Sequence, residues 1–119
     1  LNFLALQLLG SENSSNIIRD LKRDFSDTDN ENYKGLIPAL KLLRFIDLRT
    51  IVSKVITPSL IISGGRDKLT PCDASLWMQK RIKNSKIKNI ETASHLPFIS
   101  HKKNVLNLIS EFLESSNGK

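Results

Sequence analysis

The sequence has few residues that could build a covalent or metal-based framework. It contains one cysteine, so no disulfide can form within the chain and an oxidising compartment is not implied. Paired cysteines at the spacing of structural zinc sites are absent, which leaves two histidines and scattered carboxylates as candidate ligands. We therefore expect neither a metal nor a cofactor.

Long apolar runs and aromatic residues are also scarce. No stretch approaches the ~18 uninterrupted apolar residues that span a bilayer, so we expect no membrane-spanning segment. The net charge is +6, and the densest basic stretch, residues 80–88, contains no aromatic side chain on which a base could stack. This pattern favours a solvated basic face over a nucleic-acid surface.

Residues 1–46 have the pattern of a small helical layer. The spacing of apolar residues predicts helices over 1–9, 17–25 and 36–46. Gly10 would end the first helix, and the acidic, polar run 26–33 is typical of a loop. We expect this helical segment to be distinct from residues 47–119.

Residues 47–119 alternate between strand and helix. Consecutive apolar residues predict a buried strand over 59–63, and a second short strand is expected over 87–91. Thr70 is the expected cap of the intervening helix, with Pro71 in its first turn and Asp73 completing a capping box. Ser100 is the expected cap of a last helix whose apolar stripe runs to Leu113. This order predicts an α/β fold with parallel strands.

Two short strands cannot form a stable sheet alone, because each is apolar enough to need neighbours on both sides. The sequence also opens with Leu1 instead of methionine. We therefore expect the chain to be one end of a larger sheet, with part of the protein preceding it.

Asp67 and His95 are the residues most suited to chemistry. Asp67 follows the first predicted strand and His95 follows the second. Because the carboxyl ends of parallel strands share one edge of a sheet, these side chains are expected to meet there. A carboxylate beside an imidazole fixes its tautomer and stabilises the imidazolium formed during proton transfer. Taken singly, Asp67 could be a turn residue and His95 an idle loop histidine.

The two loops resemble those of the α/β-hydrolases. The stretch ITPSLIISGGRDKLTP is similar to the loop that delivers the aspartate of a Ser-His-Asp triad, and ETASHLPFISH is similar to the histidine loop. The stretches FLALQLLG, LKLLRFIDLR and SHLPFISH resemble the esterases of biotin synthesis that hydrolyse the methyl ester of pimeloyl-acyl-carrier protein. The likeness extends over nearly all of the chain and implies the C-terminal part of that fold, with residues 1–46 as cap and 47–119 as core.

The resemblance assigns roles to individual residues. It implies that Asp67 is the triad acid and that His95 is the general base, which also contacts substrate. It implies that a cap segment lines the substrate pocket, comprising Phe3, Leu4, Ala5, Leu6 and Gln7, although burial in a helix core would explain the four apolar ones equally well. It further implies that Arg19 binds the acidic carrier protein, whereas Asn2 and Ser15 stand where other arginines of the pattern fall. A cytoplasmic enzyme, monomeric at full length, is expected.

The sequence contains no G-x-S-x-G, so the nucleophile elbow and oxyanion hole are expected outside this chain, which alone should be inactive. His101 is the competing imidazole, and a surface or capping role is expected for it. Two alternatives stay open. One is an α/β-hydrolase acting on another ester or a dehalogenase-like enzyme, and the other is a basic binding module in which Asp67 and His95 are incidental.

Overall fold

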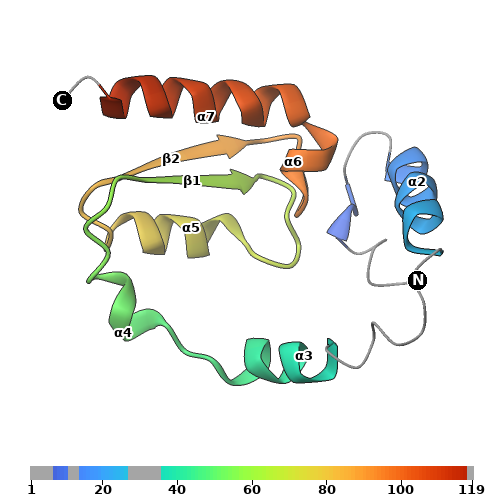
Figure 1. Cartoon of the computed structure of the whole chain (residues 1–119), viewed down its shortest axis with the longest axis horizontal. Coiled ribbons are helices and arrows are strands. Elements are labelled where there is room, and N and C mark those ends of the chain that lie inside the picture. Colours follow the sequence, from blue (N-terminus) through green and yellow to red (C-terminus); the bar gives the residue numbers. More distant parts are fainter. Residues whose placement is uncertain (1–6, 11–13, 27–35, 118–119) are drawn as a thin grey trace.

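Two parallel strands form the centre of the fold (Figure 1). The computed structural model describes residues 7–10, 14–26 and 36–117. Strand β1 (Ser59–Gly64) pairs with β2 (Ser85–Ile90), in a register that runs from Ser59 opposite Ser85 to Gly64 opposite Ile90. Helix α5 (Cys72–Gln79) connects them, as parallel strands require. The predicted parallel α/β unit is confirmed.

Helices cover both faces of this sheet. Helix α7 (Lys102–Asn117) lies along one face and α5 lies along the other (Figure 1). Ile62 and Ile90 face α7, which places Val105 and Leu108 against them over the fully buried Ala93. The predicted apolar stripe of α7 is only partly covered. Leu106, Ile109 and Leu113 on the same helix are exposed.

Helices α2, α3 and α4 precede the sheet in the described part of the chain. Helix α2 (Ser14–Ser26) lies beyond the carboxyl ends of the strands, while α3 (Leu36–Phe45) and α4 (Arg49–Val52) lie on the side of α5 (Figure 1). The helices predicted over 17–25 and 36–46 are confirmed. Gly10 ends a turn with a φ of 88°, a conformation that favours glycine. Residues 1–6 of the helix predicted over 1–9 lie outside the described residues, and so do residues 27–33 of the predicted loop.

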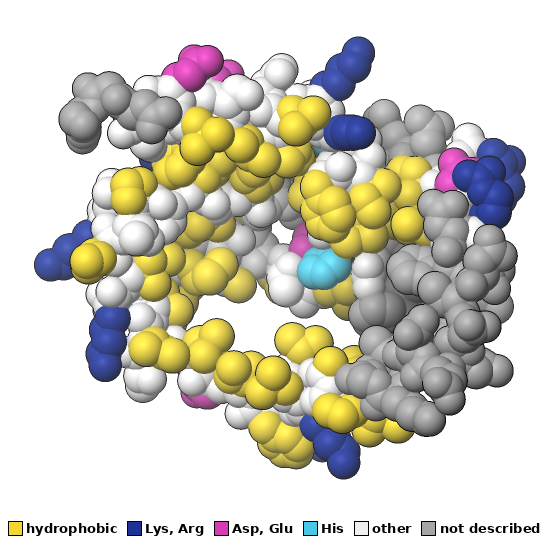
Figure 2. Space-filling view, viewed as in Figure 1, with side chains coloured by type: hydrophobic (Ala, Val, Ile, Leu, Met, Phe, Trp, Pro, Cys, Tyr) yellow, Lys and Arg dark blue, Asp and Glu magenta, His cyan; other side chains and the backbone are white. Residues whose placement is uncertain are grey.

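Helix α3 carries a row of exposed large apolar side chains. Ile37, Leu40, Leu43 and Phe45 are 58–75% exposed. Figure 2 shows apolar side chains lining the opening between this part of the chain and the sheet. Within the described ranges nothing covers them. A surface of this kind is typical of one that packs against another part of a protein or against a ligand.

Two predicted helix starts are wrong. Pro71 occupies the N-cap position of α5 and no side chain caps that helix, because the hydroxyl of Thr70 bonds to Asp67. Ser100 ends the short helix α6 (Pro97–Ser100) instead of starting α7, and its hydroxyl donates to the carbonyl of Leu96. None of the helices in the described ranges has the length and apolar character of a membrane span.

Gly64 generates a prediction about stability. A Cβ atom placed there would collide with the carbonyl oxygens of Ser94 and Ala93, lying 2.6 Å from the latter. In the whole protein, Gly64→Ala is therefore expected to lower the free energy of unfolding by about 1–3 kcal/mol, as overpacking does. Urea unfolding measures this change, with the exposed Ser53→Ala as control. Equal stability of the two variants would contradict the close approach of these backbones.

Candidate active site

The loops that follow the two strands are bonded to each other. Gly65 donates its N–H to the carbonyl of Ile90 at 2.9 Å, and Arg66 donates its own to the carbonyl of Ala93 at 2.9 Å. These bonds continue the strand pairing one step past the sheet. Residues that follow on each loop, Asp67 and His95, are thereby brought to the same edge.

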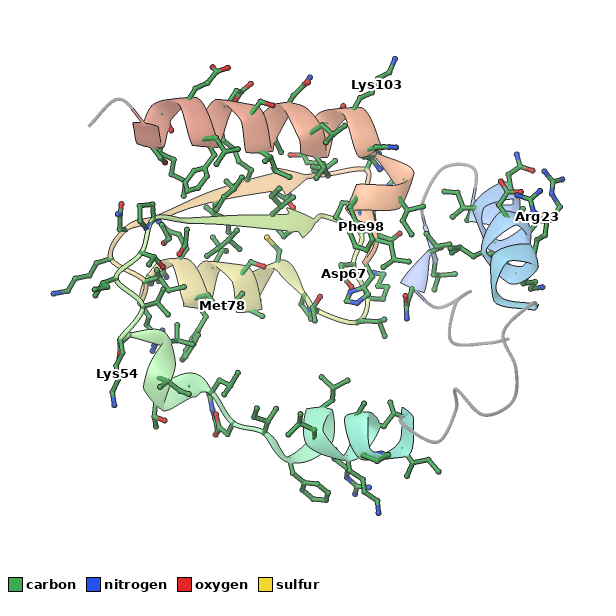
Figure 3. The ribbon with its side chains drawn as sticks, viewed as in Figure 1. Arg23, Lys54, Asp67, Met78, Phe98 and Lys103 are labelled. Atoms are coloured by element: carbon green, nitrogen blue, oxygen red, sulfur yellow. The ribbon has the colours of Figure 1, made fainter. Side chains whose placement is uncertain are left out.

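Asp67 and His95 form a hydrogen-bonded pair at this edge. Nδ1 of His95 lies 2.9 Å from Oδ2 of Asp67. The Asp67 side chain is 6% exposed and that of His95 is 31% exposed. Figure 3 shows Asp67 just beyond the end of β1. Within the described part of the chain, no group bonds to Nε2 of His95, so this nitrogen can exchange a proton with a reactant.

The environment of Asp67 keeps its carboxyl group ionised. Burial by itself would raise the pKa, but the Thr70 hydroxyl, the Thr70 amide, the His95 ring and the Leu69 amide all bond to the carboxylate. The two amides lie 2.9 Å and 2.8 Å from Oδ1. Together these bonds lower the pKa of Asp67 to about 2. A permanent negative charge therefore faces the imidazole at neutral pH.

The pair borders a pocket of about 230 Å³. The pocket walls combine these two residues with apolar and small side chains, among them Ile62, Pro97 and Phe98. Figure 2 shows a histidine beside a carboxylate at the edge of the central opening. A small, partly apolar cavity next to a histidine with a free Nε2 suits general acid–base catalysis on a bound ligand.

The turn at residues 7–10 is hydrogen-bonded to both of the loops that carry Asp67 and His95. The His95 amide donates to the carbonyl of Gln7 at 3.1 Å, and the Ser94 hydroxyl donates to the carbonyl of Leu9 at 2.7 Å. The Arg66 guanidinium donates to the carbonyl of Gly10 at 2.9 Å. Three bonds from the acid and histidine loops thus fix the position of this turn against the site.

The other predicted site residues are placed as follows. Gln7 is half-buried beside the histidine loop, whereas Phe3, Leu4, Ala5 and Leu6 lie outside the described residues. Arg19 is exposed on α2, where its Nε lies 3.8 Å from a carboxylate oxygen of Asp20. The structure therefore brings together Asp67, His95 and the backbone of Gln7, with Arg19 on a separate surface.

His101 does not line this pocket, and both of its ring nitrogens contact hydroxyl groups. Its Nε2 lies 2.9 Å from the hydroxyl of Thr92, and its Nδ1 lies 2.9 Å from the hydroxyl of Ser100. Both ring nitrogens are thus occupied at the junction between α6 and α7. This arrangement gives His101 a structural part in joining the two helices.

Sequence reasoning missed Thr70 and Arg66. Thr70 was expected to cap α5, but the D-x-x-T spacing also allows a turn in which an aspartate accepts from the amides two and three residues later. Asp67 makes such a turn. No sequence signal identifies Arg66, because its partner is a backbone carbonyl far away in the chain. Among the described residues, no group of three or more potential metal ligands occurs.

Comparisons with known proteins show which proteins the chain is similar to. No family model matches the sequence. The chain is 30% identical over 113 residues to a pimeloyl-[acyl-carrier protein] methyl ester esterase of Chromobacterium violaceum, covering 95% of the chain and 44% of that protein. It is 34% identical to the protein of that name from Wigglesworthia glossinidia brevipalpis, covering 97% and 45%. The chain thus spans less than half the length of these relatives.

Solved structures show the same fold. A serine hydrolase involved in carbazole degradation superposes with a TM-score of 0.75 at 24% identity, covering 92% of this chain and 43% of its own. An α/β-fold hydrolase from Bacillus anthracis superposes with a TM-score of 0.57 at 18% identity, covering 87% and 44%. At these identities the likeness concerns the fold alone, which is the α/β-hydrolase fold predicted from the two loops.

The lowered pKa of Asp67 makes stability depend on pH. Because its folded value of about 2 lies below the ordinary 3.8, the ionised carboxylate stabilises the fold above about pH 4, and this contribution disappears between about pH 4 and pH 2. In the whole protein, the stability gap between wild type and Asp67→Asn is expected to shrink by about 2 kcal/mol over this range. Urea unfolding at several pH values measures it. A gap that stays constant, as expected for Ser53→Ala, would contradict the hydrogen-bonded carboxylate.

Proposed function

We propose that this chain supplies the acid and base of a serine carboxylesterase, because it has the α/β-hydrolase fold and is similar over most of its length to pimeloyl-[acyl-carrier protein] methyl ester esterases. The observation that carries this proposal is the hydrogen bond of 2.9 Å between His95 Nδ1 and Asp67 Oδ2 at the carboxyl edge of the strands. It orients the ring so that Nε2 is left for the reaction.

The proposed reaction proceeds through an acyl-enzyme. A serine hydroxyl from outside this chain attacks the ester carbonyl carbon while Nε2 of His95 accepts its proton. The tetrahedral intermediate expels methoxide, which takes the proton from His95 and leaves as methanol. Water then attacks the acyl-serine with His95 again as base, and the returning proton restores the serine as the acid product departs. Asp67 stays ionised throughout and stabilises the imidazolium.

The substrate class follows from the relatives. We assign to this chain the methyl ester of a pimeloyl group carried by acyl-carrier protein, as those relatives are named. The cap, residues 1–46, would contribute Phe3–Gln7 to the acyl pocket, and the core, residues 47–119, the catalytic pair. Bonds from the core to the turn at residues 7–10 support this arrangement. A cytoplasmic monomer without a cofactor is part of the proposal.

The carrier protein is proposed to dock on α2. Arg19 and Arg23 have side chains that are 75% exposed, and Lys22 lies beside them on the same helix. A carrier protein of acidic character would be attracted to these cations. Helix α2 also lies beyond the carboxyl ends of the strands, at the same edge of the sheet as the loops that carry Asp67 and His95 (Figure 1).

The two histidines provide a matched test of the catalytic assignment. In the whole protein, His95→Ala is expected to abolish methyl ester hydrolysis because it removes the proposed general base. His101→Ala is expected to keep kcat within about twofold and to lower stability by about 1 kcal/mol, since it loses only structural hydrogen bonds. Steady-state kinetics and urea unfolding measure both effects. Hydrolysis retained by His95→Ala, or lost in His101→Ala, would refute the assignment.

The carrier surface is tested by charge reversal. Arg19→Glu is expected to raise KM for the carrier-bound ester about fivefold, as an exposed charge contact is worth about 1 kcal/mol, with kcat unchanged. The KM for a small pimeloyl methyl ester should not change. Lys54→Glu makes the same charge change far from α2 (Figure 3) and is the control.

The dependence on ionic strength distinguishes electrostatic attraction of the carrier protein from other causes of a raised KM. The effect of Arg19→Glu should diminish as the ionic strength rises, because exposed charges are screened. Equal effects of Arg19→Glu and Lys54→Glu on the carrier-bound ester would remove Arg19 from carrier recognition. This result would leave the catalytic assignment intact.

A further inference from the structure

Thr70 makes contact with both members of the catalytic pair. Its hydroxyl donates to Oδ2 of Asp67, and the same oxygen lies 3.2 Å from Nδ1 of His95. Nδ1 in turn lies 2.9 Å from Oδ2 of Asp67. The three polar atoms therefore form a closed triangle, in which each contacts the other two.

The hydrogen atoms can be placed in this triangle in one consistent way. When Nε2 of His95 is free to accept a proton, Nδ1 carries hydrogen and donates to Asp67. The Thr70 hydroxyl has one hydrogen, which it donates to Oδ2, so its lone pairs remain for a weaker second bond from Nδ1–H. The Thr70 hydroxyl thus donates to the Asp67 carboxylate. It also accepts a weak hydrogen bond from Nδ1–H of His95, which donates to that same carboxylate.

The local backbone fixes this hydroxyl in place. Thr70 lies at the end of the turn in which Oδ1 of Asp67 accepts the amides of Leu69 and Thr70. Pro71 follows and restricts Thr70 to extended conformations, since the helical region is disfavoured before proline. As a β-branched residue, threonine also has few side-chain rotamers. The hydroxyl therefore loses little freedom when it bonds to the carboxylate.

We propose that Thr70 is a positioning residue for the reaction, whose hydroxyl holds the Asp67 carboxylate and the Nδ1 proton of His95 in the geometry that leaves Nε2 facing the pocket. The inference rests on the esterase function proposed above. Thr70 does not touch the reacting ester bond. It acts by holding Oδ2 of Asp67 toward Nδ1 of His95, while the amides of Leu69 and Thr70 hold Oδ1.

Substitution by an isosteric residue tests the proposal in the whole protein. Thr70→Val keeps the shape and removes the hydroxyl, so kcat for a small methyl ester is expected to fall about tenfold with KM within twofold, as for loss of one hydrogen bond to a charged group. Thr70→Ser keeps the hydroxyl and should retain kcat within about threefold. Rescue by serine distinguishes the hydroxyl from the methyl group.

The fold offers a matched control at the other histidine. Thr92 bonds to Nε2 of His101 at 2.9 Å, so Thr92→Val removes a threonine–histidine hydrogen bond of the same type away from the pocket. Its kcat should remain within twofold of wild type. The Nδ1 proton resonance, assigned by its loss in His95→Ala, supplies a second readout. It should shift or broaden in Thr70→Val and stay unchanged in Thr92→Val.

The outcomes separate this inference from the proposed function. If His95→Ala stays active, the esterase assignment itself fails. If His95→Ala is inactive but Thr70→Val keeps both kcat and the Nδ1 resonance of wild type, only the positioning role fails. If Thr70→Val and Thr70→Ala both lose the far-ultraviolet circular dichroism of the fold, Thr70 is a folding residue and the proposal is overturned.

Discussion

The hydrogen bond between His95 and Asp67 depends on a close approach between the end of β1 and the backbone just before His95. Strand β1 ends at Gly64, where any Cβ would meet the backbone of Ala93 and Ser94. Without a side chain there, the acid loop can bond to the histidine loop along its backbone, through Gly65 and Arg66. The parallel register and the two glycines, Gly64 and Gly65, thus allow the geometry of the pair.

Asp67 contributes both to the stability of this edge of the sheet and to the chemistry proposed for it. One carboxylate oxygen holds the turn of its own loop, while the other faces His95 and Thr70. Because the carboxylate is already bonded when the ring is neutral, little reorganisation is needed when the ring becomes charged. The buried charge of the carboxylate is stable only while all of its hydrogen-bond partners are in place. The turn at residues 7–10 is hydrogen-bonded to the same two loops.

Much of the structure at this edge of the sheet can be predicted from the sequence, because local patterns specify it. A run of consecutive apolar residues predicts the first strand, and an alternating pattern over 87–91 predicts the second, which the structure has at Ser85–Ile90. The loops that follow them predict the meeting of Asp67 with His95. The errors lie where alternative partners compete for one group. Thr70 has the right position to cap a helix, yet a carboxylate three residues earlier binds its hydroxyl. The bond from Arg66 to the Gly10 carbonyl depends on packing between distant segments, for which the sequence holds no local signal.

A crystal structure of the whole protein, with a phosphonate ester bound covalently to its nucleophile, would test the central claim most directly. Nε2 of His95 should lie about 3 Å from the serine oxygen that carries the phosphonate, as a general base must. Nδ1 should remain bonded to Asp67. A different imidazole at the nucleophile, or a His95 ring turned away from it, would contradict the account.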